Sequence, residues 1–299
     1  MKKVIELTKV LLKNTNNQFT MQNKSKASKR GVLILVIYVA IIFGYLSYNI
    51  VDMLIQINQP VIFLGMLLIA ISALVIFQTI VTSINMFYMS RDIEYLLPMP
   101  ITPKELLMAK FNTLLITEYV MELLFTIVPI IIYGMLTNAG LIFYIYAIFV
   151  LLLFPILPAA IASLIIVFIM SFSKKTKNKD KYAVVATIIS IIFVIGIQFI
   201  AMPEVEMTEE QLVQNFVKLN GMIDVVGKYF ITIKPSLEAL ANYSNLFGGV
   251  SILKLGVMTA ISYMLFVILG NKLYLKGAVR KCGKLRKCER KSNKKEIII

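Results

Sequence analysis

Residues 123–173 decide the fold, and they read LLFTIVPIIIYGMLTNAGLIFYIYAIFVLLLFPILPAAIASLIIVFIMSFS. These 51 residues contain no charged side chain. A helix that crosses a lipid bilayer needs about 20 largely apolar residues, so the stretch is too long for a single crossing. The cluster Thr137-Asn138-Ala139-Gly140 is typical of a turn. We therefore expect two membrane-spanning helices joined by this turn.

The whole chain has the composition of a membrane protein. Of its 299 residues, 59% are hydrophobic and 16% are charged, against about 45–50% and about 25% in soluble domains. The mean hydropathy is +0.82. A chain of this length cannot bury so much apolar surface in a fold that faces only water. Lipid is therefore expected to form part of its solvent.

Uncharged stretches on both sides of this region predict an all-α membrane protein with six transmembrane helices. Pro129, Pro155 and Pro158 fall inside the expected helices and are expected to kink them. The six spans are expected near residues 31–51, 60–88, 111–136, 141–172, 182–202 and 249–274.

Basic residues orient these spans, because Lys and Arg accumulate on the cytoplasmic side of a membrane. The loop 51–60 and the turn 137–140 hold none, and the loop 203–248 holds three against six acids. The remaining basic residues fall almost entirely in residues 1–30, 89–110, 173–181 and 271–299, which hold eight, three, five and eleven. We therefore expect both termini in the cytoplasm, with a basic leader (1–30), a transmembrane domain (31–274) and a basic tail (275–299).

The formal charge of +15 is explained by this topology, and no nucleic-acid partner is expected. The lysine clusters at 173–181 and 271–295 are expected to rest on anionic lipid. Docking of an acidic protein is the alternative for these clusters.

The sequence gives little support for a catalytic or metal-binding site. There is no histidine, and the two cysteines, Cys282 and Cys288, lie in the basic tail. Gly277, Gly283 and Lys284 come nearest to a phosphate-binding loop, but Leu285 stands where Ser or Thr must bind magnesium. We expect no catalytic residue, metal site or cofactor, and no ATP hydrolysis by this chain itself.

The inner loop 89–110 contains two expected helix starts. Residues 90–98 have an N-terminal serine cap, one apolar face and a terminating proline, which predicts a short interfacial helix. Thr102 caps the next helix, with Pro103 at its first position and Glu105 completing a capping box. The short helix fits an anchor for two spans, and it also fits a lever on which a cytoplasmic partner pushes.

The outer loop 203–248 is expected to contain short interfacial amphipathic helices. Thr208 begins another capping box, and apolar residues follow at helical spacing from Leu212 to Phe230. The chain restarts at Pro235, and Leu237, Leu240 and Ala241 form a second apolar face. These helices either rest on the outer leaflet or cover the end of the bundle.

Glu118 and Glu122 lie four residues apart, on one face of the third span. A charge at the middle of a bilayer costs about 2.5–3.5 kcal/mol on insertion scales, so such groups face the bundle or a wet cavity. One hypothesis is a proton, cation or substrate path that these carboxyls line with Thr82 and Asn85. The other is a structural role, in which Thr82, Ser83 or Asn85 hold the carboxyls by hydrogen bonds.

The run Arg91-Asp92-Ile93-Glu94-Tyr95-Leu96-Leu97-Pro98-Met99-Pro100-Ile101, followed by Lys110-Phe111, resembles a loop of a known family. It is similar to the first cytoplasmic loop in membrane subunits of bacterial ATP-binding-cassette exporters. In that family an acidic helix ending in Leu-Leu-x-x-Pro-Ile, before a Lys at the foot of the third span, marks the coupling helix. The expected architecture resembles that family along nearly the whole chain.

This resemblance implies a permease of the bacterial plasma membrane that pairs with a separate ATP-hydrolysing subunit. Some members continue into a second set of spans, so a second permease half or a second copy is an expected partner. The polar faces of spans two and three would line the path. The residues that would contact the ATPase are Arg91, Asp92, Ile93, Glu94, Leu96 and Leu97.

Two other functions stay open on the sequence. One is an ion-coupled secondary transporter or channel that uses Glu118 and Glu122 and needs no ATPase. The other is a membrane anchor that transports nothing.

Overall fold

The computed structural model describes residues 2–22, 26–89, 101–172 and 232–296. Helices are the only regular elements in these ranges. They are α1 (Lys2–Gln22), α2 (Lys26–Gln56), α3 (Val61–Ile84), the π-helix η1 (Asn85–Met89), α5 (Pro103–Leu136), α6 (Leu141–Leu153), α7 (Ile156–Phe172), α10 (Ile233–Ala241) and α11 (Leu246–Glu296).

Five helical stretches are long and apolar enough to cross a membrane, which makes the chain a multi-pass membrane protein. They match the first, second, third, fourth and sixth expected spans. The expected span at 182–202 and the amphipathic stretch 208–230 lie outside the described residues. The five stretches are Ile34–Gln56, Val61–Phe87, Lys104–Leu136, Leu141–Ile169 and Leu246–Leu273.

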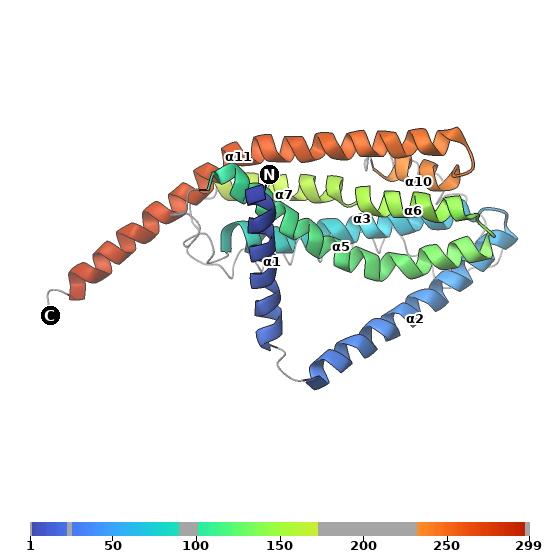
Figure 1. Ribbon diagram of the computed structural model, residues 1–299, viewed down its shortest axis with the longest axis horizontal. Helices are drawn as coiled ribbons and strands as arrows, with labels where there is room; N and C mark the ends of the chain where they lie inside the picture. Colours follow the sequence, from blue (N-terminus) through green and yellow to red (C-terminus); the bar gives the residue numbers. More distant parts are fainter. Residues whose placement is uncertain (1, 23–25, 90–100, 173–231, 297–299) are drawn as a thin grey trace, which may run out of the picture.

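These spans run alongside one another as an elongated bundle (Figure 1). We call one end the α1 end, where α3 and η1 finish and α5 begins, and the other the α10 end, where α5 turns into α6. The expected turn at 137–140 is confirmed at the α10 end. Asn138 has a φ of 50° there, a left-handed conformation that asparagine tolerates better than most residues.

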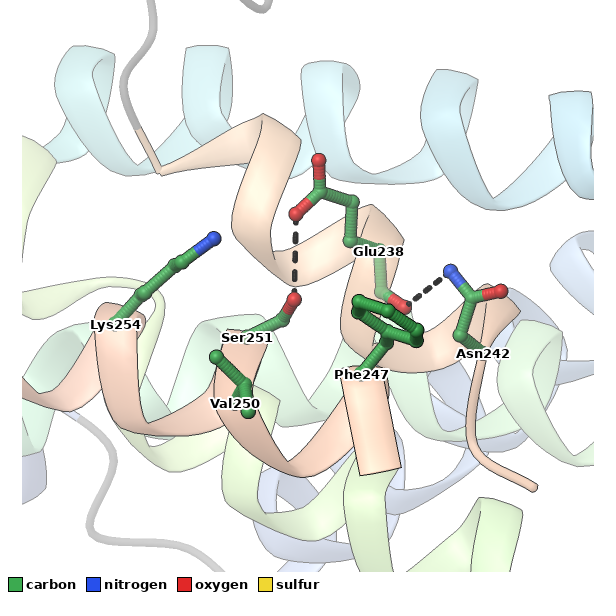
Figure 2. Close-up of a pocket in the computed structure, with 6 residues that line it drawn as sticks. All are labelled: Glu238, Asn242, Phe247, Val250, Ser251 and Lys254. Carbon is green, nitrogen blue, oxygen red and sulfur yellow. Dashed lines mark hydrogen bonds between the residues drawn. The ribbon is translucent and has the colours of Figure 1, made fainter. Parts of the chain in front are cut away.

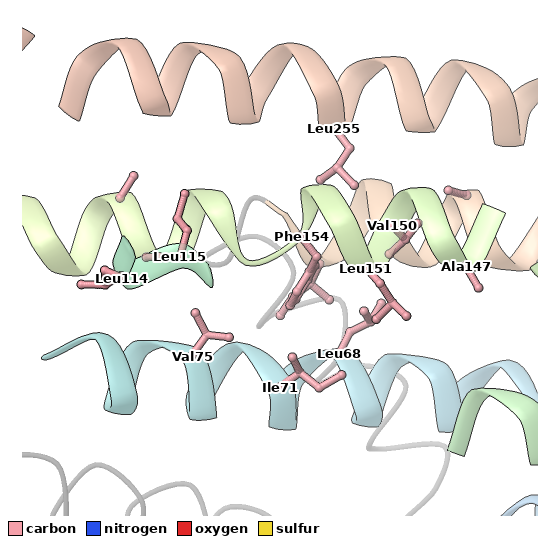
Figure 3. Packing of buried hydrophobic residues seen from close by; sticks show 14 of the residues in the cluster. Leu68, Ile71, Val75, Leu114, Leu115, Ala147, Val150, Leu151, Phe154 and Leu255 are labelled. Carbon is pink, nitrogen blue, oxygen red and sulfur yellow. The ribbon is translucent and has the colours of Figure 1, made fainter. Parts of the chain in front are cut away.

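The core consists of layers of apolar side chains between α11, the α6–α7 pair and α3 (Figure 3). Figure 3 shows Leu255 above Phe154, with Leu68 and Ile71 on the other side. On α7 the small residues Ala159 and Ala160 are fully buried, and α7 packs closely against α11. Small residues let helices approach closely, which favours packing where lipid supplies no hydrophobic driving force.

The expected proline kink in the fourth span is confirmed as a break between α6 and α7. Pro155 has no N–H to donate to the preceding turn, and its ring disrupts the helix there. The chain resumes a helix at Ile156, with Ala159 N–H donating to the Pro155 carbonyl at 3.0 Å. Phe154, 1% exposed, fills the break.

The end of the expected outer loop forms the short helix α10, which lies inside the bundle end. The restart near Pro235 is confirmed, but the buried face differs from the expected one. Leu240 is buried, whereas Leu237 and Ala241 are half-buried. The face packed on α11, α3 and α6 contains Ile233, Pro235, Ser236, Ala239 and Leu240. α10 therefore closes this end of the bundle.

Both terminal segments form helices that the sequence pattern did not predict. The leader 1–30 contains α1, which runs across the α1 end of the bundle (Figure 1). α1 buries Val4 and Leu11 against Ala109 of α5. At the other terminus α11 continues through the basic tail to Glu296, a stretch without proline and rich in Lys and Arg, which favour helix.

We predict that Gly248→Ala destabilises the α10–α11 corner. A Cβ at Gly248 would collide with the Asn242 carbonyl oxygen, which is backbone and cannot rotate away. Overpacking of this kind costs about 1–3 kcal/mol. Unfolding temperature in detergent, measured on the full chain, should fall. Gly249→Ala is the matched control, because its Cβ would meet only the Tyr146 hydroxyl at 3.5 Å. Equal unfolding temperatures for the two variants would contradict the packing described here.

Candidate functional site

Polar side chains gather on the inward faces of the spans. On α3, Ser72, Thr79 and Ser83 are all at most 1% exposed, and their spacing places them on one face of the helix. Thr113 and Thr126 of α5 are also buried. Their hydroxyls donate hydrogen bonds to the carbonyls of Ala109 and Glu122, one turn earlier, at 2.8 and 2.6 Å. The bundle interior thus contains hydrogen-bonding groups on several helices while these side chains have almost no exposed surface.

Glu118 and Glu122 face this interior, as the spacing predicted. Neither side chain is more than 1% exposed. Thr79 donates its hydroxyl to Glu118 Oε1 at 3.2 Å. The other oxygen of Glu118 and both oxygens of Glu122 have no hydrogen-bond partner among the described residues. Three carboxyl oxygens therefore lie buried without a donor, an arrangement that normally costs free energy.

The helix spacing keeps the nearest basic residue of α5 away from this pair. Lys110 lies eight residues before Glu118, about 12 Å along the helix axis at 1.5 Å per residue. Its side chain is also directed elsewhere, as described below. The two carboxyls are therefore not held by an intrahelical ion pair.

Within the described residues, the other two residues expected on the path form no hydrogen bond with the carboxyls. Thr82 is half-buried and donates to the Gln78 carbonyl at 2.8 Å, and Asn85 is exposed at the start of η1. Ser83 pairs with Ser163 of α7 at 3.1 Å. The hydrogen-bonding role that the sequence suggested for α3 residues thus falls to Thr79.

Tyr119, next to Glu118, links α5 to the break in the fourth span. Its hydroxyl donates to the Leu152 carbonyl at 2.5 Å. That carbonyl lies at the end of α6, where Pro155 interrupts the helical ladder. The Tyr119 hydroxyl thus supplies the hydrogen bond that a backbone N–H would give to this carbonyl in a continuous helix.

At the α1 end, Lys110 is fully buried and ties α5 to η1. Its Nζ donates to the Met86 carbonyl at 2.6 Å. Met86 lies within the π-helix Asn85–Met89, whose wider turn changes which carbonyls the helix uses for itself. A hydrogen bond from a charged donor is stronger than one between neutral groups. Lys110 therefore holds together the two segments that flank residues 90–100.

Aromatic rings extend this link to α11. Phe111 stacks on Phe266 with ring centroids 4.1 Å apart, and Phe87 of η1 lies 6.1 Å from Phe266. Tyr263 donates its hydroxyl to Asn112 Oδ1 at 3.1 Å. We call Phe87, Lys110, Phe111, Tyr263 and Phe266 the junction, because they join η1, α5 and α11.

The six expected ATPase-contacting residues, in the run 91–97, lie outside the described residues. The segments on both sides are described, and the helix start after them is confirmed. Thr102 Oγ1 accepts from the Glu105 N–H at 3.3 Å, and the Thr102 N–H donates to Glu105 Oε2 at 2.9 Å. This capping box, with Pro103 at the first turn, fixes where the chain enters α5.

Sequence reasoning missed Thr79 as a functional candidate, and of the junction it singled out only Lys110 and Phe111, as part of the family resemblance. Thr79 had a usable signal, since its helical spacing from Ser72 and Ser83 marks a polar face on an otherwise apolar span. The sequence signal for the junction is weaker, because aromatic residues are common in membrane spans. The contacts between these rings also depend on how three separate helices pack. Among the described residues, no group of His, Cys, Asp or Glu could hold a metal ion.

The chain was compared with protein families, curated proteins and solved structures. Residues 25–298 match the family model described as "Putative ATP-binding cassette". No curated protein and no solved structure matches the chain.

We predict that Glu122→Met raises the unfolding temperature of the full chain in detergent more than Glu118→Met does. Methionine is similar in size and carries no group that must be hydrogen-bonded, so the first variant removes a buried unpaired polar group worth about 1–3 kcal/mol. The second variant also strands the Thr79 hydroxyl, which reduces its gain. A larger gain for Glu118→Met would contradict the hydrogen bonding described here.

Proposed function

The chain belongs to the family described as "Putative ATP-binding cassette", and from this premise we propose that it is the permease subunit of an exporter driven by a separate ATPase. The spans form the translocation path, and the loop 90–105 receives the motion of the ATPase. Both termini lie in the cytoplasm of a bacterial cell, with the lysine clusters 173–181 and 271–295 against anionic lipid of the plasma membrane.

The junction is the observation that carries this proposal. A coupling loop works only if a push on it moves the spans as a body, and a flexible attachment would absorb that push. Lys110 connects η1 to α5 through a 2.6 Å hydrogen bond, and Phe111 and Phe266 connect α5 to α11. A force on residues 91–97 therefore reaches three helices through short, packed contacts.

The buried polar face is the proposed path in its closed state. Thr79 and Ser83 of α3, Glu118 and Glu122 of α5, and Ser163 of α7 are together in the interior with almost no exposure. Opening would separate α3 from α5 or α7 and hydrate these groups. The free-energy cost of the unpaired carboxyl oxygens is then removed, because water or a donor on the substrate forms hydrogen bonds with them.

A second permease half, or a second copy of the chain, is the proposed partner of α2. The span Ile34–Gln56 has the smallest buried share of the five spans. Near its middle, Tyr45 is 70% exposed and Asn49 is exposed beside it. Asn49 donates its amide N–H to the Tyr45 carbonyl at 2.9 Å, but the Tyr45 phenol, facing hydrocarbon at that depth, would lack a hydrogen-bond partner. Cover by another protein helix explains its presence.

An ion-coupled transporter or channel is the second candidate, favoured by the unpaired oxygens of Glu118 and Glu122. It requires no ATPase, so the energy source separates the two candidates. Export that follows ATP in everted vesicles without an ion gradient supports the permease. Export that follows an ion gradient without ATP, and stops in the double variant Glu118→Gln/Glu122→Gln, supports the second candidate.

We predict that reversing Asp92 and Glu94 to Lys abolishes association with an ATPase. The tagged chain, purified in mild detergent from its native host, should bring down a nucleotide-hydrolysing subunit, because two acidic groups in the coupling loop would pair with its basic residues. The double reversal should reduce the recovered ATPase by about tenfold or more, since removing close charge pairs in an interface costs several kcal/mol. Mass spectrometry of the eluate measures both.

The matched control is Glu6→Lys, an exposed charge reversal on α1 at the same end of the bundle. It should leave the recovered ATPase unchanged. Absence of any ATPase with the folded, inserted wild-type chain would contradict the permease proposal, and equal loss in both variants would contradict docking at the loop.

A further inference from the structure

A hollow of about 320 Å³ lies between α10 and the first turns of α11 (Figure 2). Its lining combines charged, polar and apolar side chains from both helices. They are Glu238, Asn242, Phe247, Val250, Ser251 and Lys254.

Two opposite charges border this hollow without pairing. Figure 2 shows the Lys254 ammonium and the Glu238 carboxylate directed toward the same space. Glu238 Oε2 accepts from the Ser251 hydroxyl at 3.2 Å, and Ser251 is 4% exposed, so the carboxylate is held in place. Within the described part of the chain, Lys254 and Glu238 form no ion pair with each other. The hollow therefore presents a positive and a negative group side by side to an incoming ligand.

The depth of Lys254 places this pair near the headgroups of the lipid. The span Leu246–Leu273 has 28 residues, about 42 Å of helix at 1.5 Å per residue, whereas the hydrocarbon core is about 30 Å thick. Lys254 follows Leu246 by eight residues, about 12 Å along the axis. A centred span therefore puts Lys254 about 6 Å inside the hydrocarbon boundary, a distance that its long side chain can cover by reaching outward.

The lipid-facing side of α11 continues this site toward the membrane interior. Leu253 is 70% exposed and Val257 is 59% exposed, and both follow the hollow along the helix. An acyl chain can lie along them while its headgroup occupies the hollow. Phe247 and Val250 are exposed at the rim, on the water side of Lys254, where they border the headgroup.

We propose that this hollow binds the headgroup of a zwitterionic phospholipid that carries a phosphate and a primary ammonium. Lys254 pairs with the phosphate, and Glu238, positioned by Ser251, accepts hydrogen bonds from the ammonium. A purely anionic headgroup could still pair its phosphate with Lys254, but it has no ammonium to place against Glu238, so that carboxylate would repel it. A quaternary ammonium has no N–H to donate to the carboxylate. The site therefore selects the phosphoethanolamine class, independently of what the permease exports.

The test uses the full chain purified in detergent, with phosphatidylethanolamine or phosphatidylglycerol of the same acyl chains titrated in and bound lipid counted by native mass spectrometry. Phosphatidylethanolamine should bind more tightly. Lys254→Gln should weaken both lipids by about fivefold, the upper range for an ion pair that water reaches. Glu238→Gln, which keeps the acceptor for Ser251, should weaken phosphatidylethanolamine alone by a similar factor.

Lys272→Gln is the matched control, because Lys272 is an exposed lysine on the same helix but at the other end of the span. It should leave both affinities unchanged. Glycerophosphoethanolamine without acyl chains should compete only weakly, since it lacks contact with Leu253 and Val257. Equal binding of the two lipids to the wild type, or equal loss of both in Glu238→Gln, would overturn the proposal. Strong competition by the soluble headgroup would overturn its lipid part.

Discussion

A hydrocarbon solvent offers no hydrogen bonds, so every polar group at membrane depth must find its partner within protein or in enclosed water. This constraint organises the structure. It requires helices in the spans. It also explains why the hydroxyls of Thr113 and Thr126 donate hydrogen bonds to carbonyls of their own helix. Where Pro155 interrupts the ladder, the Tyr119 hydroxyl donates to the Leu152 carbonyl. The exceptions are informative, because Glu118 and Glu122 keep unpaired oxygens in the interior.

The same constraint gives Lys110 its importance. A buried ammonium must be hydrogen-bonded, and the Met86 carbonyl of η1 supplies an acceptor. Because Lys110 cannot leave this contact without a large cost in desolvation, it holds the two segments that flank the inner loop at a fixed separation. The stacked rings of Phe111 and Phe266 connect these two segments to α11. The proposed loop-driven permease would require a stiff junction of this kind next to the buried polar interior.

Much of this fold can be predicted from the sequence, because long apolar stretches form membrane-spanning helices. The charge-free run 123–173, its turn at Asn138, the break at Pro155 and the capping box of Thr102 are all local signals, and all are confirmed. The partner of Glu118 is not a local property. Thr79 and Thr82 lie about 60° apart around α3, so the choice between them depends on how the helix is rotated in the bundle. Likewise, the π-helix at Asn85 and the docking of α1 on α5 are set by tertiary packing. The coupling residues 91–97 lie outside the described residues, and their role stays a prediction.

The central claim is that the junction transmits an ATP-driven motion to the closed polar interior. The most direct measurement places Glu122→Cys in a chain with Cys282→Ser and Cys288→Ser, in inside-out membrane vesicles of the native host. Labelling by a membrane-impermeant maleimide then reports whether water reaches residue 122. The account predicts low labelling without ATP, a clear increase with ATP, and no increase when Lys110→Met is added. Labelling that is unaffected by ATP in the chain with Lys110 intact would contradict it.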